Sequence, residues 1–161
     1  MKKKKMKNNK RIFVTFQKEG LHKWPDAIDH PGVEFLANEH RHMFHFRVDL
    51  QVFHDDREVE FILFKRELEG LYTEGTLQLD YKSCEMMADE LGEYIQEKYP
   101  HRHFSIEVSE DGENGCLVEF INTNPTNPIK FKEEYQQTEV IGKVYSDGRG
   151  GIYQVNEPGK V

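Results

Sequence analysis

The stretch 43–53, MFHFRVDLQVF, constrains the fold of this chain most, because apolar and polar residues alternate from Phe44 to Val52. Successive side chains of a β-strand point to opposite faces, so every apolar side chain of this run shares one face. The stretch therefore predicts a strand of a sheet that covers a core on one side and carries polar residues on the other.

The flanking sequence predicts the remaining elements and their order. Short aromatic and β-branched runs at 11–16, 103–110 and 116–121 predict three more strands, the last two joined as a hairpin by a Gly-containing turn. Apolar residues recur at helical spacing over 64–72 and 83–99, which predicts two helices between the strand pairs. The order strand-strand-helix-helix-strand-strand indicates an α+β fold.

Composition places these elements in one domain. The chain has 161 residues, 37% of them apolar, which suffices for one core but not for two domains. We expect the domain over 11–122, after a basic tail over 1–10 and before an extension over 123–161 that could form a small hairpin. The two cysteines, Cys84 and Cys116, make no disulfide framework, and we expect reduced thiols.

Charge and hydropathy limit the location and partners of the protein. No apolar run reaches the roughly 18 residues of a membrane span, so we expect a soluble, cytoplasmic protein without a membrane partner. Residues 1–11 hold six Lys, one Arg and no acid, which leaves 15 basic against 29 acidic residues elsewhere. This tail could contact nucleic acid or act only as a solvated tail. The acidic body argues against nucleic acid as the main partner.

Two histidines begin the alternating run. His40 and His42 share one face of the predicted strand, whereas Arg41 and His45 lie on the other. Zinc binds neutral imidazole, and catalytic zinc sites combine three protein ligands with an open position. A pair at this spacing presents two nitrogens and needs a third from elsewhere. The alternative is that both are ordinary polar residues on a solvent-facing side of the strand.

Four short segments carry a resemblance to a known family. They are HRHMFHFRV from His40, VEFILFK at 59–65, SCEMMA at 83–88 and VSED at 108–111. In this order they resemble the motifs of the 6-pyruvoyl-tetrahydropterin synthase and 6-carboxy-tetrahydropterin synthase family, which acts on a pterin triphosphate. The resemblance spans about residues 11 to 121 and includes His22, after the first strand, at the place of the family's first zinc histidine.

The resemblance implies a set of site residues. His22, His40 and His42 would hold one zinc ion. Glu110 would anchor the ring of a pterin or guanine-derived ligand, because a carboxylate matches its adjacent amino and ring N–H groups with two parallel hydrogen bonds. The helix start at Ser83, Cys84 and Glu85 would line the same pocket. From the residues alone, Ser83 is also suited to cap the helix, and Glu85 to interact with its dipole.

The resemblance also implies a quaternary structure. The family has the T-fold, a four-stranded antiparallel sheet with both helices on one face. A lone sheet of this kind has open edges, and the family closes them by joining subunits into a barrel, commonly a hexamer. The expected partners are therefore further copies of this chain and a pterin or guanine-derived small molecule.

The chain departs from the family in its acid/base residues. The loop 26–39, DAIDHPGVEFLANE, lacks the cysteine that serves as base, and Asp80 with Tyr81 only faintly resembles the family's Asp-His pair. Arg41 replaces a glycine. Glu34, Glu39 and Asp80 are possible bases without motif support, so the catalytic residues stay unassigned.

Two functions remain open. The first is a zinc-dependent carbon–oxygen lyase, or a related enzyme, that acts on a dihydroneopterin triphosphate-like compound with an altered acid/base set. The second is a catalytically silent T-fold protein that binds a ligand or a protein partner.

Overall fold

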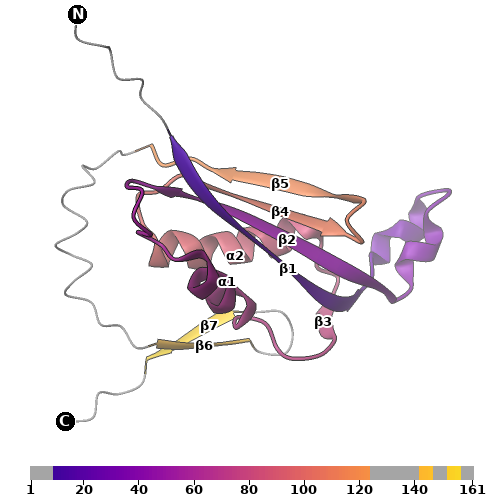
Figure 1. Cartoon of the computed structure of the whole chain (residues 1–161). Coiled ribbons are helices and arrows are strands. Elements are labelled where there is room, and N and C mark those ends of the chain that lie inside the picture. Colours follow the sequence, from indigo (N-terminus) through magenta and orange to yellow (C-terminus); the bar gives the residue numbers. More distant parts are fainter. Residues whose placement is uncertain (1–8, 124–141, 147–151, 157–161) are drawn as a thin grey trace, which may run out of the picture.

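The computed structural model describes residues 9–123, 142–146 and 152–156 (Figure 1). Its elements are β1 (Lys10–His22), η1 (Pro25–Asp29), η2 (Glu34–Ala37), β2 (His40–Val52), α1 (Phe61–Glu69), β3 (Leu77–Asp80), α2 (Cys84–Lys98), β4 (Phe104–Glu110), β5 (Asn114–Phe120), β6 (Gly142–Ser146) and β7 (Ile152–Asn156). Most of the expected basic tail and of the expected C-terminal extension lies outside the described residues. Within the extension, β6 and β7 pair antiparallel with each other.

Five strands form the main sheet, in the order β3-β1-β2-β4-β5. The four long strands are antiparallel, whereas β3 runs parallel to β1 and pairs only with Gly20, Leu21 and His22. The α+β class is confirmed, but the expected count of four antiparallel strands is corrected to five strands, one of them parallel. The alternation of LQLD in β3 spans four residues, too few to signal a strand in the sequence.

The strand β1 is much longer than the expected 11–16. Its buried side alternates through Val14, Phe16, Gly20 and His22, and it pairs with β2 along its whole length. The segment QKEGL, at 17–21, lacks apolar alternation. The pattern that predicts a strand therefore stops at Phe16, although the strand itself continues to His22. A Cβ on Gly20 would lie 2.7 Å from Leu79 and 2.9 Å from Phe44, which explains a glycine at this position.

The core lies between the inner face of the sheet and the helices. The alternating apolar residues Phe44, Phe46, Val48 and Leu50 of β2 are all buried in it, as the pattern predicts. In α2, which packs on β4 and β5, the expected apolar side is buried. Ser83 is confirmed as the N-cap, since its hydroxyl accepts the Met86 N–H.

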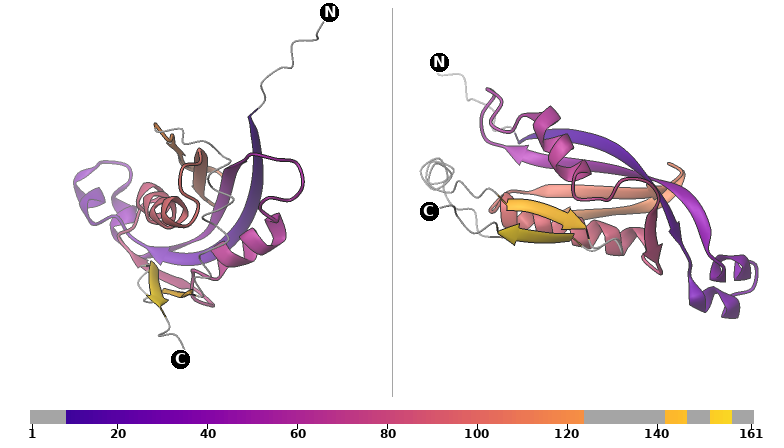
Figure 2. Two further views of the ribbon diagram at one scale, coloured as in Figure 1. Left: turned by 90° about the vertical axis from the view of Figure 1, so that its left-hand side faces the viewer. Right: turned by 90° about the horizontal axis from the view of Figure 1, so that it is seen from below.

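The helix α1 packs on the first strand of the sheet. Its buried residues Phe64 and Leu68 join the core, and the helix packs along β1 (Figure 2). Its Lys65 and Glu69 also line a hollow on the opposite face of the sheet. It also lies beside α2, because the Tyr94 and Tyr99 hydroxyls donate to Glu67 of α1 at 2.7 and 2.9 Å.

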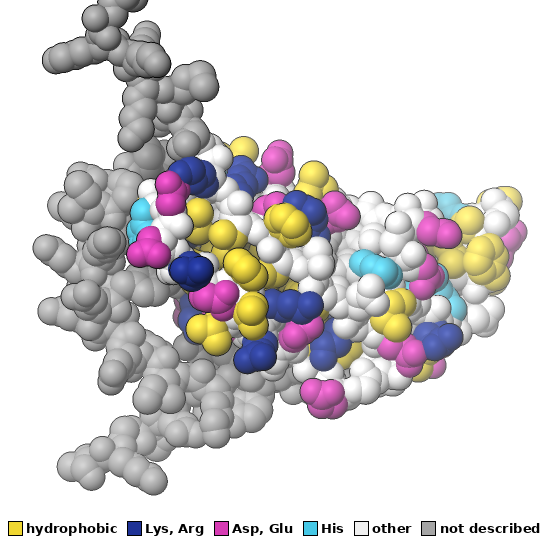
Figure 3. Space-filling view, in the orientation of Figure 1, with side chains coloured by type: hydrophobic (Ala, Val, Ile, Leu, Met, Phe, Trp, Pro, Cys, Tyr) yellow, Lys and Arg dark blue, Asp and Glu magenta, His cyan; other side chains and the backbone are white. Residues whose placement is uncertain are grey.

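The segment η1–η2 projects beyond the sheet at the end where β1 and β2 meet (Figure 1). Hydrophobic side chains gather on this projection in the space-filling view (Figure 3). Among its residues, Trp24, Ile28 and Phe35 are 43%, 65% and 66% exposed. In the described part of the chain, every helix is too short or too polar to cross a membrane.

Candidate metal centre

Three histidines converge on the inner face of the sheet, at the end of β1 and the start of β2. His22 pairs with His40 across the β1–β2 ladder, and His42 is the next inward residue of β2. The ring centroids are 4.6 Å apart for His22 and His40, 5.3 Å for His22 and His42, and 5.0 Å for His40 and His42. One ring nitrogen from each lies within 4.8 Å of the other two, close enough to serve one ion.

In each of the three rings, Nδ1 lies within hydrogen-bond distance of an oxygen acceptor. Nδ1 lies 2.9 Å from the Lys82 carbonyl oxygen in His22, 2.8 Å from the Asn38 carbonyl in His40, and 2.6 Å from Asp111 Oδ2 in His42. Carbonyl and carboxylate oxygens only accept, so Nδ1 carries the proton in all three rings. In the neutral form of each ring, which binds metal, the lone pair is then on Nε2. Histidines that bind metals are oriented in this way by their outer partners.

Two of these acceptors, at Lys82 and Asp111, are placed by neighbouring strands. Lys82 follows β3, and the pairing of β3 with β1 continues in the bond from Lys23 N–H to the Asp80 carbonyl, 2.7 Å long. Asp111 begins the turn after β4 in the left-handed conformation, with φ of 54°. Its Oδ1 accepts the Met43 N–H at 2.9 Å, which fixes the carboxylate beside His42.

Asp111 is a site residue that the sequence did not reveal. The hydrogen bond with His42 and then the one from the Met43 N–H lower the pKa of its carboxyl, so the carboxylate form is favoured. In the sequence it looks like the first residue of an ordinary Asp-Gly turn. Only the antiparallel pairing of β4 with β2 brings this turn to the histidines.

Glu110 faces the same three rings. It continues the inward face of β4, opposite Phe44 of β2. Its Oε1 lies 3.2 Å from His22 Nε2 and its Oε2 lies 3.6 Å from His42 Nε2. Within the described residues, neither Nε2 has a hydrogen-bond partner, although both atoms are buried. Buried polar atoms are rarely left without a partner. The two unpartnered Nε2 atoms, of His22 and His42, therefore indicate a binding site for a ligand.

The donor set fits a zinc ion. Zinc takes imidazole nitrogen and carboxylate oxygen ligands, and the lone pairs of the two orphaned Nε2 atoms face the space between the rings and Glu110. His22, His40 and His42 would hold the ion. When bound, it would act as a Lewis acid on a hydroxyl or carbonyl oxygen of a ligand.

The start of α2, expected to bind substrate, lies close to this cluster. Burial raises the pKa of the Cys84 thiol to about 12, and the nearby charge of Glu110 adds to the shift. Ser83 is engaged as the helix cap, and Glu85 is an exposed acid in the first turn. The free thiol of Cys84 is therefore neutral in the absence of a metal, and no disulfide forms with Cys116.

Arg41 lies between His40 and His42 in the sequence but points away from the histidines. Its guanidinium donates to Glu19 at 2.6 Å, and Thr76 donates to the same carboxylate. The bonds from Thr76 and then Arg41 lower the pKa of Glu19. Since residue 41 faces outward, the arginine does not interfere with the two histidines on the inner face.

The three possible bases proposed from sequence are arranged differently. Glu34 accepts the Gly32 N–H at 2.8 Å, and Asp80 forms an ion pair with Lys23 at 3.5 Å. Glu39 is exposed on the segment between η2 and β2. The structure brings none of them into the histidine cluster that it forms from the described residues.

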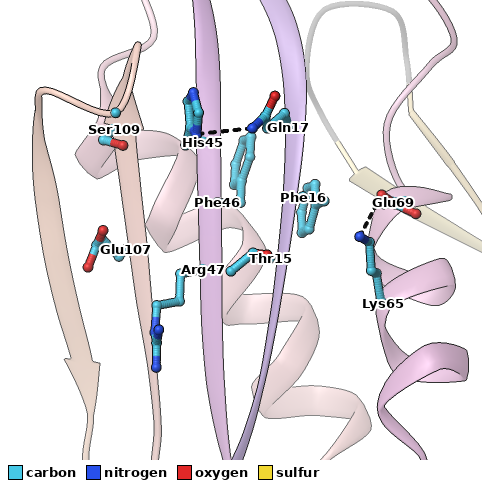
Figure 4. Close-up of a pocket in the computed structure, with 11 residues that line it drawn as sticks. Thr15, Phe16, Gln17, His45, Phe46, Arg47, Lys65, Glu69, Glu107 and Ser109 are labelled. Atoms are coloured by element: carbon cyan, nitrogen blue, oxygen red, sulfur yellow. Dashed lines mark hydrogen bonds and ion pairs between the residues drawn. The ribbon is translucent and has the colours of Figure 1, made fainter.

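A separate hollow of about 590 Å³ lies on the other face of the sheet (Figure 4). It is lined by Thr15, Phe16, Gln17, His45, Phe46, Arg47, Lys65, Glu69, Glu107, Ser109 and Gly112. His45 contacts Gln17 there at 3.3 Å, as expected for a histidine on the face away from the ligands. This broad, mixed-charge surface does not include the three histidines or Glu110, which lie on the inner side.

No protein-family model matches the chain, and no curated protein matches it. The resemblance to the pterin synthases therefore rests on the motifs, their order and the arrangement of the residues.

Proposed function

We propose that the chain is a zinc-dependent, pterin-synthase-like protein that binds a pterin or guanine-derived triphosphate. The observation that carries the proposal is the convergence of His22, His40 and His42 with every Nδ1 held by an acceptor. This arrangement directs the metal-binding nitrogens at one point before any ion is bound. The expected reaction is that of a carbon–oxygen lyase or a related enzyme.

The arrangement of the strands supports the T-fold part of the proposal. The strands β1, β2, β4 and β5 form an antiparallel sheet in that order, with the two helices between the strand pairs in sequence. In this reading β3 is an addition at one edge. Ser83, Cys84 and Glu85 at the start of α2 would line the substrate pocket, beside the metal.

We also propose that the protein is a homo-oligomer, with a hexamer as the expected form. The strand β5 is an edge of the sheet and carries the exposed Leu117, while Ile121 directly after it is also exposed. An apolar edge strand is a template for pairing with another chain. Exposed apolar side chains on the η1–η2 projection add a second surface of the same kind.

A catalytically silent ligand-binding or partner-binding protein is the second candidate. The absence of cysteine between His22 and His40 favours it, because the family's base would stand there. Proton transfer needs a positioned group of suitable pKa, and Glu34 and Asp80 are engaged with Gly32 and Lys23.

Metal analysis combined with a ligand panel tests the proposal. The purified protein is expected to contain one zinc ion per chain and to bind dihydroneopterin triphosphate more tightly than GTP or ATP. Release of the triphosphate from the pterin would support the lyase, and tight binding without turnover would support the silent binder. Protein that takes up no zinc after chelation and reloading would refute both forms of the proposal.

A further inference from the structure

We infer that Glu110 is a fourth ligand of the metal, and not the group that anchors the ring of the substrate. The inference rests on the metal site proposed above and changes the role that the family resemblance gives to this residue. It is drawn from the contacts of the Glu110 carboxylate with two of the three histidines.

The first argument is the spacing of the donor atoms. For ligand bonds of about 2.0 to 2.1 Å and tetrahedral angles, two ligands of one zinc ion lie roughly 3.3 Å apart. Glu110 Oε1 lies 3.2 Å from His22 Nε2, and Oε2 lies 3.6 Å from His42 Nε2. Both separations match ligands that share an ion with His22 and His42, the two histidines that Glu110 approaches. Neither contact is a hydrogen bond, and both Nε2 atoms lack a partner among the described residues.

The second argument is electrostatic. In neutral rings with the proton on Nδ1, each Nε2 presents a lone pair, and the carboxylate of Glu110 presents further lone pairs to it. Electron pairs that face each other in a partly buried site repel unless a cation lies between them. A metal ion bound by all of these atoms removes the repulsion and satisfies both orphaned nitrogens at once.

The third argument concerns the competing role. Two parallel hydrogen bonds to a pterin or guanine edge need both carboxylate oxygens on one side. Here one oxygen lies against His22 and the other against His42, so in this conformation the two oxygens do not present a shared edge to a ring.

Exposure suggests what the fourth ligand does. The Glu110 side chain is 31% exposed, against 9% for His22 and 20% for His42. Glu110 is thus more exposed than these two histidines. From this position it would close the metal centre in the resting protein and could give its place to a hydroxyl or carbonyl oxygen of a bound ligand.

Metal binding by Glu110→Gln tests the inference without an activity assay. The variant keeps the shape of the side chain but removes its charge. Glu107→Gln is the matched control, because it makes the same change on the same strand, on the opposite face. Each protein is freed of metal, checked for folding by circular dichroism, and titrated with Zn²⁺ against a competing chelator. Titration with Co²⁺ adds a visible spectrum that reports the ligands and their geometry.

We expect Glu110→Gln to bind Zn²⁺ at least roughly 100-fold more weakly, since losing an outer partner alone costs about 10- to 100-fold. Its Co²⁺ spectrum should differ from that of the unmutated protein, whereas Glu107→Gln should match it in both measurements. Unchanged affinity and spectrum in Glu110→Gln would overturn the inference while the three-histidine site stands. Absence of Zn²⁺ and Co²⁺ binding in the unmutated protein would instead remove the site itself. Glu110→Ala replaces the glutamine variant if that variant does not fold, with the same expected loss.

Discussion

Asp111 Oδ2 accepts a hydrogen bond of 2.6 Å from Nδ1 of His42, across the turn that follows β4. The same carboxylate accepts the Met43 N–H, so it is held on two sides. The bond fixes both the tautomer and the orientation of the His42 ring. Asp111 is thus a positioning residue for the proposed metal centre.

Asp111→Asn should weaken zinc binding by about 10- to 100-fold while the protein stays folded. The amide removes the charge that supports the basicity of His42 and can turn a donor toward Nδ1. Zinc affinity by chelator competition measures the effect, with Glu113→Gln in the same turn as control. Equal zinc affinity in Asp111→Asn and the unmutated protein would exclude a positioning role.

His40→Ala and His42→Ala should each remove zinc without unfolding the sheet. The core consists of apolar residues of the sheet and helices, so the fold does not depend on the metal as that of a zinc finger does. Metal content by mass spectrometry and the thermal unfolding of metal-free protein give the two readouts. His45→Ala, on the opposite face of β2, is the control. If both variants keep one zinc per chain, the ligand assignment is wrong.

The sequence predicted which histidines share the inner face of the sheet, but not the acceptor atoms that orient their rings. Spacing alone placed His40 and His42 together, because alternate residues of a strand share a face. The resemblance supplied His22, which lies opposite His40 since β1 continues past its apolar part. The carbonyls of Asn38 and Lys82 could not be predicted, because every residue offers such an acceptor and only the folded chain selects two of them.

The strand β3 was missed for a related reason. Its four residues pair in parallel with the end of β1, more than fifty positions earlier in the chain. Parallel pairing joins distant segments and leaves no turn signal between neighbouring strands. In contrast, the cap at Ser83 and the buried side of α2 depend on local spacing, and both were predicted correctly.

The ion pair between Glu58 and Arg102 should make stability depend on pH. Burial alone would raise the pKa of Glu58, but bonds from the Phe53 N–H and from Arg102 outweigh it and hold the pKa below its ordinary value. The folded state therefore gains stability from Glu58 above about pH 4.3, the ordinary pKa. This gain is lost as the pH falls through the lower folded pKa.

Glu58→Gln should therefore lower the free energy of unfolding by about 2 kcal/mol at pH 7, as expected for lost hydrogen bonds of a charged group. The difference from the unmutated protein should shrink in acid, below about pH 4. Urea unfolding of metal-free protein at several pH values measures it, with the exposed Glu74→Gln as control. A difference that stays constant down to low pH would contradict the assignment.

Leu117→Lys should weaken the proposed homo-oligomer. Leu117 is 62% exposed on the edge strand β5, and lysine on an edge opposes pairing with another chain. Light scattering at micromolar concentration should show the unmutated protein as an oligomer and the variant shifted toward the monomer. Glu97→Lys, exposed on α2, is the control for added positive charge. A monomeric unmutated protein would contradict the proposal.

The unmutated protein should bind a pterin ligand yet show little or no turnover as a 6-pyruvoyl-tetrahydropterin synthase. A Lewis acid alone does not remove the proton that the reaction must move. No cysteine stands between His22 and His40, and burial keeps the Cys84 thiol neutral with a pKa of about 12 in the metal-free protein. Calorimetric titration with dihydroneopterin triphosphate, beside a product assay on the same zinc-loaded sample, separates binding from chemistry. His40→Ala serves as the control, because loss of zinc should abolish any turnover that depends on the metal. Rapid turnover that disappears in this variant would show that another group of the chain supplies the base.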